Sequence, residues 1–214
     1  MPQLIVNEIF YSIQGESSRA GLPCVFVRLT GCNLRCAYCD TAYAFHEGQN
    51  LSLDEILSAV RRHGCRLVEV TGGEPLMQEG VYDLMTRLCD EGYETLLETG
   101  GSLDIGRVDP RVTRIVDFKC PSSGMAKKNL WENVRYLNDC DEVKFVIGNR
   151  EDFDWSLARI REHDLERRGR ILMSVVFGEL APRELAGWIL ESGVGARMQL
   201  QMHKYIWDPA TRGV

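Results

Sequence analysis

The sequence predicts an α/β protein: a partial, open TIM-like barrel of about six parallel strands with outer helices, plus an N-terminal strand/loop extension. Three observations lead to this fold class. Apolar strand-like runs alternate with amphipathic helix-like runs, which is typical of parallel sheets covered by helices. Six or seven such units occur, fewer than a complete TIM barrel contains. Glycines and polar residues gather directly after the strand-like runs, where ligands bind in such folds.

The strand candidates are short, rich in β-branched residues and bounded by turn residues. They are residues 24–30, 66–71, 94–99, 113–119, 142–147 and 170–176, with 197–202 as a candidate seventh strand. Ahead of this alternation lies the segment LIVNEIFYSIQGE, within residues 1–23. It predicts a strand with a polar loop, added on top of the barrel.

The helix candidates lie between the strands. Ser52 and Glu55 form a capping-box pattern, which predicts a helix from this point to about residue 63. The other helices are expected near residues 79–91, 129–137, 152–167 and 182–192. We expect one domain over residues 1–214, with an N-terminal extension (1–23), a barrel core (24–202) and a C-terminal tail (203–214).

Composition narrows the class of protein. With 214 residues and 44% hydrophobic content, the chain can build a core without disulfides. No apolar run approaches about 18 residues and no basic-then-apolar leader begins the chain, so we expect a cytoplasmic protein with no membrane partner. The net charge of −6 argues against nucleic acid as the main partner. Eight cysteines in a reducing compartment indicate metal binding or chemistry rather than a disulfide scaffold.

Three of these cysteines, Cys32, Cys36 and Cys39, are spaced C-x3-C-x2-C after the first strand of the barrel. Thiolates favour zinc, copper(I) or iron–sulfur clusters. Structural zinc requires four ligands, and the sequence offers no second cysteine pair. Three ligands on a cubane leave one iron open, which suggests a [4Fe–4S] cluster that also binds a small molecule. The alternative is a zinc site with a distant fourth ligand, such as Cys24 or His46.

The turn VTGGEP (70–75) follows the next strand. Its two glycines let the backbone approach a ligand closely, and Glu74 supplies a carboxylate that could meet an ammonium group. By itself this pattern also fits a plain strand-to-helix turn.

Together, the cysteine triplet with an aromatic residue before its third cysteine and the GGEP turn resemble the radical S-adenosylmethionine (SAM) enzymes. Further segments resemble the 7-carboxy-7-deazaguanine synthase family over nearly the whole chain. They are EIFYSIQGES (8–17), VFVRLTGCNLRCAYCDT (25–41), TGGEP (71–75), ETGGS (98–102), DFKCPSSG (117–124), DEVKFVI (141–147) and LQMHKYIW (200–207).

The resemblance implies a ring-contracting lyase of 7-deazapurine (queuosine) biosynthesis. It would convert 6-carboxy-5,6,7,8-tetrahydropterin to 7-carboxy-7-deazaguanine with loss of ammonia. The implied cofactors are one [4Fe–4S] cluster, SAM and Mg²⁺, and the implied partners are an electron donor such as flavodoxin and a second copy in a homodimer. The alternative within the superfamily is a small radical SAM activase that acts on a partner protein.

The resemblance also implies roles for individual residues, with no catalytic residue beyond the cluster and SAM. The cluster ligands would be Cys32, Cys36 and Cys39, and the magnesium ligand Thr41. The SAM contacts would be Tyr38, Asp40, Gly73, Glu74, Lys119 and Ser122. The substrate contacts would be Ile13, Gln14, Gly15, Arg28, Thr71 and His203.

The residues alone leave alternatives open. Thr41 could be an ordinary turn hydroxyl, and Arg28 could form an ion pair with Glu8 or Glu69 instead of binding an anion. His203 could be a core or surface histidine. Lys144 either points into the barrel or lies at the surface.

Overall fold

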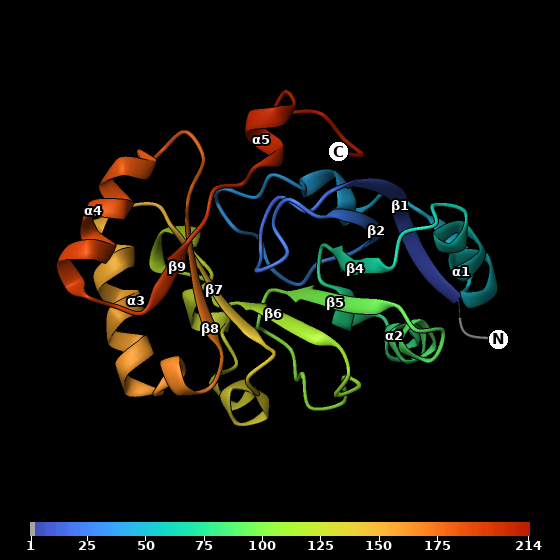
Figure 1. Ribbon diagram of the computed structural model, residues 1–214, viewed down its shortest axis with the longest axis horizontal. Coiled ribbons are helices and arrows are strands. Elements are labelled where there is room, and N and C mark those ends of the chain that lie inside the picture. The colour runs from blue at the N-terminus through green and yellow to red at the C-terminus, as the bar shows by residue number, and fades with distance from the viewer. Residues whose placement is uncertain (1–2) are drawn as a thin grey trace.

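The computed structural model describes residues 3–214 and contains one sheet with outer helices (Figure 1). The strands are β1 (Gln3–Ile13), β2 (Pro23–Leu29), β3 (Gln49–Ser52), β4 (Leu67–Gly72), β5 (Glu94–Thr99), β6 (Thr113–Asp117), β7 (Glu142–Ile147), β8 (Arg170–Val175) and β9 (Ala196–Met198). The helices are α1 (Leu53–Arg61), α2 (Gly80–Asp90), α3 (Arg150–Glu162), α4 (Pro182–Ser192) and α5 (His203–Ile206).

The nine strands follow the order β3-β1-β2-β4-β5-β6-β7-β8-β9, and the sheet does not close on itself. Each neighbouring pair from β2 to β9 is parallel, whereas β1 runs antiparallel to both β2 and β3. The predicted partial, open barrel is therefore confirmed. The short β9 is the candidate seventh strand.

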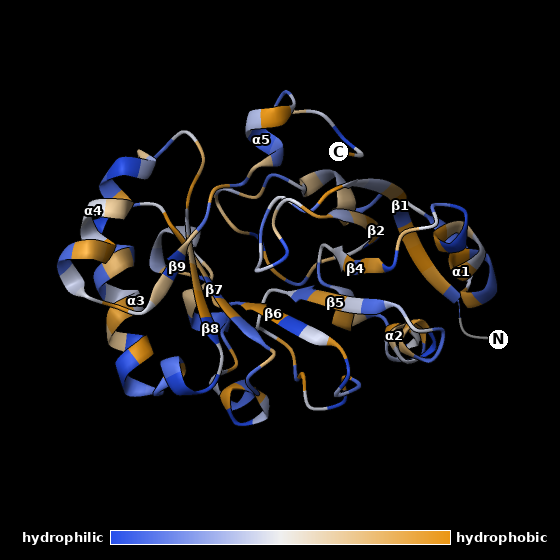
Figure 2. Cartoon of the chain, viewed as in Figure 1, coloured by the Kyte–Doolittle hydropathy of each residue, from blue (hydrophilic) through white to orange (hydrophobic). Residues whose placement is uncertain are grey.

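The barrel strands are buried on both faces, as parallel strands between two layers usually are. Val68 and Val70 of β4 belong to the main core between the sheet and the helices, together with Leu57 and Leu84. The helices carry both hydrophobic and hydrophilic residues around their circumference (Figure 2), which fits one face packed on the sheet and one in solvent.

The inner face of the sheet has an apolar part and a charged part, which follow one another along the strands. A small apolar cluster fills one part of the barrel and consists of Cys24, Phe26, Leu67, Leu96 and Ile115. Because side chains on a strand alternate between faces, the next inward positions toward the carboxyl ends are Arg28, Glu69, Glu98 and Asp117. Charged groups thus lie directly above the apolar floor of the barrel.

The capping box at the start of α1 is present as predicted: Ser52 Oγ accepts from the Glu55 amide, and the Glu55 carboxylate accepts from the Ser52 amide. The predicted helix at 129–137 is wrong, because this segment forms a 3₁₀ helix (Trp131–Tyr136). Its buried Asn133 accepts from the Ile105 amide and donates to the Leu103 carbonyl. These bonds tie the segment to a neighbouring loop instead of an α-helical ladder.

Three other expectations need correction. The helix predicted at 152–167 ends at Glu162, because Asp164 adopts a left-handed conformation with φ of 51°. The strand predicted at 197–202 stops at Met198, beyond which the chain turns into α5. The N-terminal segment does not lie on top of the barrel but extends the sheet, since β1 pairs with β2 over most of its length.

The loop between β1 and β2, residues 14–22, turns inward across the open side of the barrel and contacts inward-facing side chains of β4, β5 and β7. We call it the β1–β2 loop. Within residues 3–214, no helix is long and apolar enough to cross a membrane.

Candidate active site

A cavity of about 770 Å³ opens at the carboxyl ends of the barrel strands. It receives residues from the β1–β2 loop, the cysteine loop that follows β2, the ends of β4 to β8 and the C-terminal segment. Fourteen of the sixteen predicted site residues line it: Ile13, Gln14, Gly15, Arg28, Cys32, Cys36, Tyr38, Cys39, Asp40, Thr41, Thr71, Gly73, Lys119 and His203. The other two, Glu74 and Ser122, lie outside its lining.

The three cysteines are free thiols that face this cavity from one loop. The loop is fixed by internal contacts: the Cys39 amide donates to the Cys36 carbonyl (3.2 Å) and the Ala37 amide to the Ser123 carbonyl (3.0 Å). The guanidinium of Arg35 donates to the Cys32 carbonyl (2.8 Å). Burial raises the pKa of both Cys32 and Cys36, so metal binding as thiolates would release protons.

The donor set fits an iron–sulfur cluster better than zinc. Neither Cys24 nor His46, the candidate fourth zinc ligands, lines the cavity. Cys24 is buried in the apolar floor, and His46 is exposed. Across residues 3–214, no three His, Cys, Asp or Glu side chains already converge at metal-binding spacing, so we expect the three sulfur atoms to draw together around a cluster.

The glycine turn after β4 packs directly on the cysteine loop. The Gly73 amide donates to the Leu29 carbonyl (3.2 Å) and the Glu74 amide to the Gly31 carbonyl (2.8 Å). A Cβ atom on Gly73 would lie 2.2 Å from the Gly31 carbonyl oxygen, so only glycine permits this approach. The turn and the cysteine loop therefore form one rigid unit.

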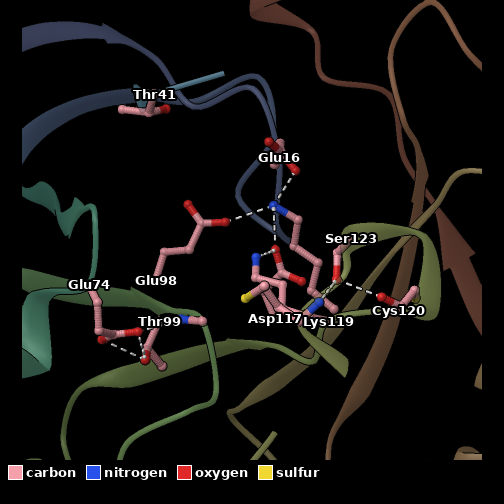
Figure 3. Close-up of polar contacts among 12 residues, drawn as sticks. Glu16, Thr41, Glu74, Glu98, Thr99, Asp117, Lys119, Cys120 and Ser123 are labelled. Carbon is pink, nitrogen blue, oxygen red and sulfur yellow. Dashed lines mark hydrogen bonds and ion pairs between the residues drawn. The ribbon is translucent and has the colours of Figure 1, made fainter. Parts of the chain in front are cut away.

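Glu74 is buried and already hydrogen-bonded within the protein (Figure 3). Its carboxylate accepts from the Thr99 hydroxyl (2.9 Å), the Gly100 amide (2.8 Å) and the Leu76 amide (3.1 Å). Burial raises its pKa, although these hydrogen bonds oppose the effect. The carboxylate thus joins the ends of β4 and β5, and an ammonium group in the cavity would meet the turn's backbone first.

Among the residues that the structure describes, the Tyr38 hydroxyl and Oδ1 of Asp117 are buried in the cavity wall without a hydrogen-bond partner. Such atoms are costly unless a ligand or water satisfies them. The other carboxylate oxygen of Asp117 accepts from Lys119 Nζ at 2.8 Å. Burial alone would lower the pKa of Lys119, but Asp117 raises it, so the ammonium stays charged. This wall fits SAM, which carries hydroxyls, amines and a carboxylate.

Ser122 points away from the cavity. Its hydroxyl and its amide both donate to the carboxylate of Asp152, near the start of α3. A contact between Ser122 and SAM stays a prediction.

Asp40 and Thr41, which follow the last cysteine, contact each other. The Thr41 hydroxyl donates to Asp40 Oδ1 at 2.8 Å, and Asp40 Oδ2 lies 2.6 Å from Lys204 Nζ. The Thr41 oxygen also lines the cavity, where it could meet a hard cation such as Mg²⁺.

Elsewhere in the lining of the cavity, Gly15 packs against His203. A Cβ on Gly15 would lie 2.3 Å from His203 Nδ1, and the Met202 amide donates to the Gly15 carbonyl (3.0 Å). Burial lowers the pKa of His203, so its imidazole is neutral at neutral pH. The amide nitrogen of Gln14 donates to Glu69, which orients that side chain.

Arg28 adopts the ion-pair alternative with Glu8 and still faces the cavity. Its Nε lies 2.8 Å from Glu8 Oε1, which also accepts from the Tyr43 hydroxyl (2.9 Å). Within residues 3–214, neither terminal guanidinium nitrogen has a hydrogen-bond partner. Two donors are therefore available for an anion in the cavity.

Eight charged residues of the cavity wall are absent from the predicted site, among them Glu16, Glu98, Asp117 and Lys144. Lys144 points into the barrel, with Nζ 2.6 Å from Glu16 Oε2, 2.7 Å from Glu98 Oε1 and 3.9 Å from Asp117 Oδ2. For Glu98, Asp117 and Lys144, the signal available in the sequence was a charged residue at an inward position of an otherwise apolar strand.

Comparison with known proteins gives consistent matches. Residues 26–120 match the Radical SAM superfamily. The chain is 49% identical to 7-carboxy-7-deazaguanine synthase of Chlorobaculum tepidum, over 99% of this chain and 97% of that protein. It is 43% identical to the synthase of Koribacter versatilis, over 98% and 99%. QueE from Escherichia coli shares the fold, with a TM-score of 0.79 at 22% identity over 92% of this chain and 93% of that chain.

Proposed function

Because this chain belongs to the 7-carboxy-7-deazaguanine synthase family of radical SAM enzymes, we propose that it converts 6-carboxy-5,6,7,8-tetrahydropterin to 7-carboxy-7-deazaguanine with loss of ammonia. The product would feed queuosine or another 7-deazapurine. The observation that carries the proposal is the cavity, since it joins the cysteine loop and glycine turn of a radical SAM enzyme to a polar chamber inside the barrel.

Cys32, Cys36 and Cys39 would hold the [4Fe–4S] cluster at the mouth of the cavity. When bound, the reduced cluster supplies the electron that cleaves SAM, which provides for abstraction of a hydrogen atom from the substrate and its later return. The protein's own part is to bind and orient. The Gly73 backbone, Tyr38 and Asp117 offer hydrogen-bonding groups beside the cysteine loop.

Other groups that line the cavity suit the pterin. The free guanidinium nitrogens of Arg28 would bind its carboxylate in a bidentate manner. Gln14 and the neutral His203, which also line the cavity, can each donate and accept hydrogen bonds. The hydroxyl of Thr41, at the entrance, would hold Mg²⁺ together with substrate oxygens and water.

The C-terminal segment favours a small substrate over the activase alternative. Residues 209–214 line the cavity together with the cysteine loop, and Arg212 anchors them through Glu47 (2.9 Å) and by stacking on Tyr43 (3.9 Å). A segment of a partner protein would have to displace this tail. An electron donor such as flavodoxin, a homodimeric state and a cytoplasmic location stay predictions.

The test is mass spectrometry of anaerobically reconstituted protein incubated with SAM, a reductant, Mg²⁺ and 6-carboxytetrahydropterin. We expect 7-carboxy-7-deazaguanine and ammonia, with SAM used catalytically. Cleavage of SAM without this product would retain the radical SAM class and overturn the assigned substrate.

A further inference from the structure

Lys144 carries a buried ammonium group in the wall of the cavity. Its side chain is 5% exposed, and three carboxylates from three different elements surround it: Glu16 of the β1–β2 loop, Glu98 of β5 and Asp117 of β6. Figure 3 shows Glu16 and Glu98 reaching the same ammonium from different directions. None of the roles proposed above uses this lysine.

The contact with Glu16 is one of four between the β1–β2 loop and the barrel strands. Gln14 donates to Glu69, the Ser18 amide donates to Glu142 (3.0 Å), and Arg19 pairs with Glu94 (2.6 Å). The loop also contacts the C-terminal segment, where the Met202 amide donates to the Gly15 carbonyl (3.0 Å) and the Gln201 side chain donates to the other carboxylate oxygen of Glu16 (3.1 Å). The Arg19 pair is partly exposed and contributes little, as surface ion pairs generally do. The contact between Glu16 and the desolvated Lys144 contributes more to holding the loop, because removing one partner of a buried pair leaves an uncompensated charge.

Lys144 and the carboxylates around it shift one another's pKa values. Burial alone would lower the pKa of Lys144, but Glu16 and Glu98 raise it well above its ordinary value. Burial alone would raise the pKa of Glu98, but Lys144 lowers it. The pKa of Glu69, which is buried without a cation in contact, is raised by burial and by the charge of Glu98. The charge of Lys144 thus favours the ionised form of Glu98, the carboxylate that it contacts.

We propose that Lys144 is a positioning residue that holds the carboxylates of Glu16 and Glu98 as two hydrogen-bond acceptors facing the substrate. Such a pair suits a ligand edge with several N–H donors, as in a 2-aminopyrimidinone ring. The identity of that ligand rests on the proposed function. The anchoring of the β1–β2 loop by Lys144 does not, so the two can be tested separately.

The test compares Lys144→Met with Lys144→Arg, and with Lys127→Met at an exposed lysine outside the cavity. The probe is 6-carboxypterin, the stable oxidised relative of the substrate, and its binding is followed by fluorescence. We expect Lys144→Met to weaken binding by about tenfold or more, as for the loss of charge-assisted hydrogen bonds. SAM affinity should fall less than pterin affinity, because Lys144 approaches the wall assigned to SAM only at Asp117 (3.9 Å). Lys144→Arg should lose less pterin affinity than Lys144→Met.

Hydrogen exchange without any ligand gives the second measurement. Amides of residues 14–22 should exchange faster in Lys144→Met than in the wild type, and Lys127→Met should leave them unchanged. Unchanged exchange together with wild-type pterin affinity would overturn the proposal. If the wild type does not bind 6-carboxypterin, the proposed substrate is wrong, while the exchange result still decides the role of Lys144.

Lys144→Met leaves buried carboxylates without a cation, so a folding defect is foreseen. The double variant Lys144→Met/Glu98→Gln removes one of those charges and should restore folding without restoring pterin affinity. Wild-type affinity in this double variant would contradict the role assigned to the pair. Lys144→Arg keeps the charge. The proposal therefore also requires that the amides of residues 14–22 exchange about as slowly in this variant as in the wild type.

Discussion

The ammonium of Lys204 lies 2.6 Å from a carboxylate oxygen of Asp40, and this contact joins α5 to the cysteine loop in the wall of the cavity. Lys204 also donates to Gln201 (2.8 Å), and Asp40 also accepts from Thr41 (2.8 Å). The residue directly after the third cysteine is thus tied to the C-terminal segment that lines the cavity.

Replacing Lys204 by methionine should release this contact. Burial alone would raise the pKa of Asp40, but Lys204 lowers it to about 2 from an ordinary 3.8. The stability contributed by the pair is therefore present above pH 3.8 and is lost as the pH falls through about 2. Because Asp40 is partly exposed, we expect a loss below about 1 kcal/mol at pH 6.

Denaturant unfolding of Lys204→Met and the wild type at pH 6 and pH 2 tests this dependence. The difference in the free energy of unfolding should shrink at the lower pH. Lys128→Met, at an exposed lysine, is the control. A difference that stays constant with pH would rule out the ion pair as its cause.

Gly73→Ala should damage the unit formed by the glycine turn and the cysteine loop. The added Cβ would lie 2.2 Å from the Gly31 carbonyl oxygen and 2.8 Å from Cys32 Cβ, and backbone atoms cannot give way easily. Overpacking of this kind costs about 1–3 kcal/mol. Thermal unfolding and the iron content after reconstitution should both fall.

Gly187→Ala is the matched control for this substitution. Gly187 lies within α4, and a Cβ there meets no atom within 4 Å. Alanine in a helix is favoured over glycine by about 0.8–1.0 kcal/mol, so this variant should be slightly more stable with normal iron content. If Gly73→Ala and Gly187→Ala had the same thermal stability and the same iron content, the close approach at Gly73 would be unimportant.

Cys36→Ala should abolish iron–sulfur cluster assembly and turnover, because two remaining thiolates cannot hold the cubane. Iron and sulfide analysis with the visible absorption spectrum measures the loss. Cys140→Ala, at an exposed cysteine that does not line the cavity, should retain the cluster. A normal cluster in Cys36→Ala would overturn the ligand assignment.

The alternating strands and helices were predictable because each is encoded by a local pattern, and β2 and β4 to β8 lie within about two residues of their predicted ranges. β3 was missed because Gln49–Ser52 is short and polar. The place of β1 in the sheet was missed because a strand's sequence does not identify its neighbour.

The candidate site likewise has parts that the sequence predicts and parts that only the fold determines. The cysteine loop and the glycine turn are continuous motifs, so the sequence predicts them directly. The contact between Lys144 and Glu98 joins residues 46 positions apart in the chain and depends on both strands facing inward. The inward position of Lys144 was one of two alternatives in the sequence, and only the fold decides between them.

Thr41→Ala should reduce both the turnover rate and its dependence on Mg²⁺, because the variant lacks the hydroxyl proposed to bind the metal. Thr41→Ser keeps the hydroxyl and should retain both. Rates measured over a series of Mg²⁺ concentrations check this prediction. An unchanged Mg²⁺ dependence in Thr41→Ala would remove the metal role and leave the hydrogen bond to Asp40 as the function of this residue.

Glu69→Gln should stabilise the protein at alkaline pH. Glu69 is 3% exposed, and its pKa is raised well above 4.5 by burial and by the charge of Glu98. A group whose pKa is raised by folding contributes stability that is complete below its ordinary pKa and is lost as the pH rises through the folded value. Glutamine does not ionise, and its amide oxygen can still accept from Gln14.

The two proteins should therefore have similar free energies of unfolding near pH 4.5, and Glu69→Gln should gain at higher pH. Each tenfold change in proton affinity is worth about 1.4 kcal/mol, so we expect an advantage of about 1 kcal/mol or more at pH 8. Denaturant unfolding at pH 5 and pH 8 measures it, with Glu94→Gln at the partly exposed end of β5 as the control. An advantage that does not grow with pH would mean that Glu69 is already ionised in the folded protein, with a cation or water compensating its charge.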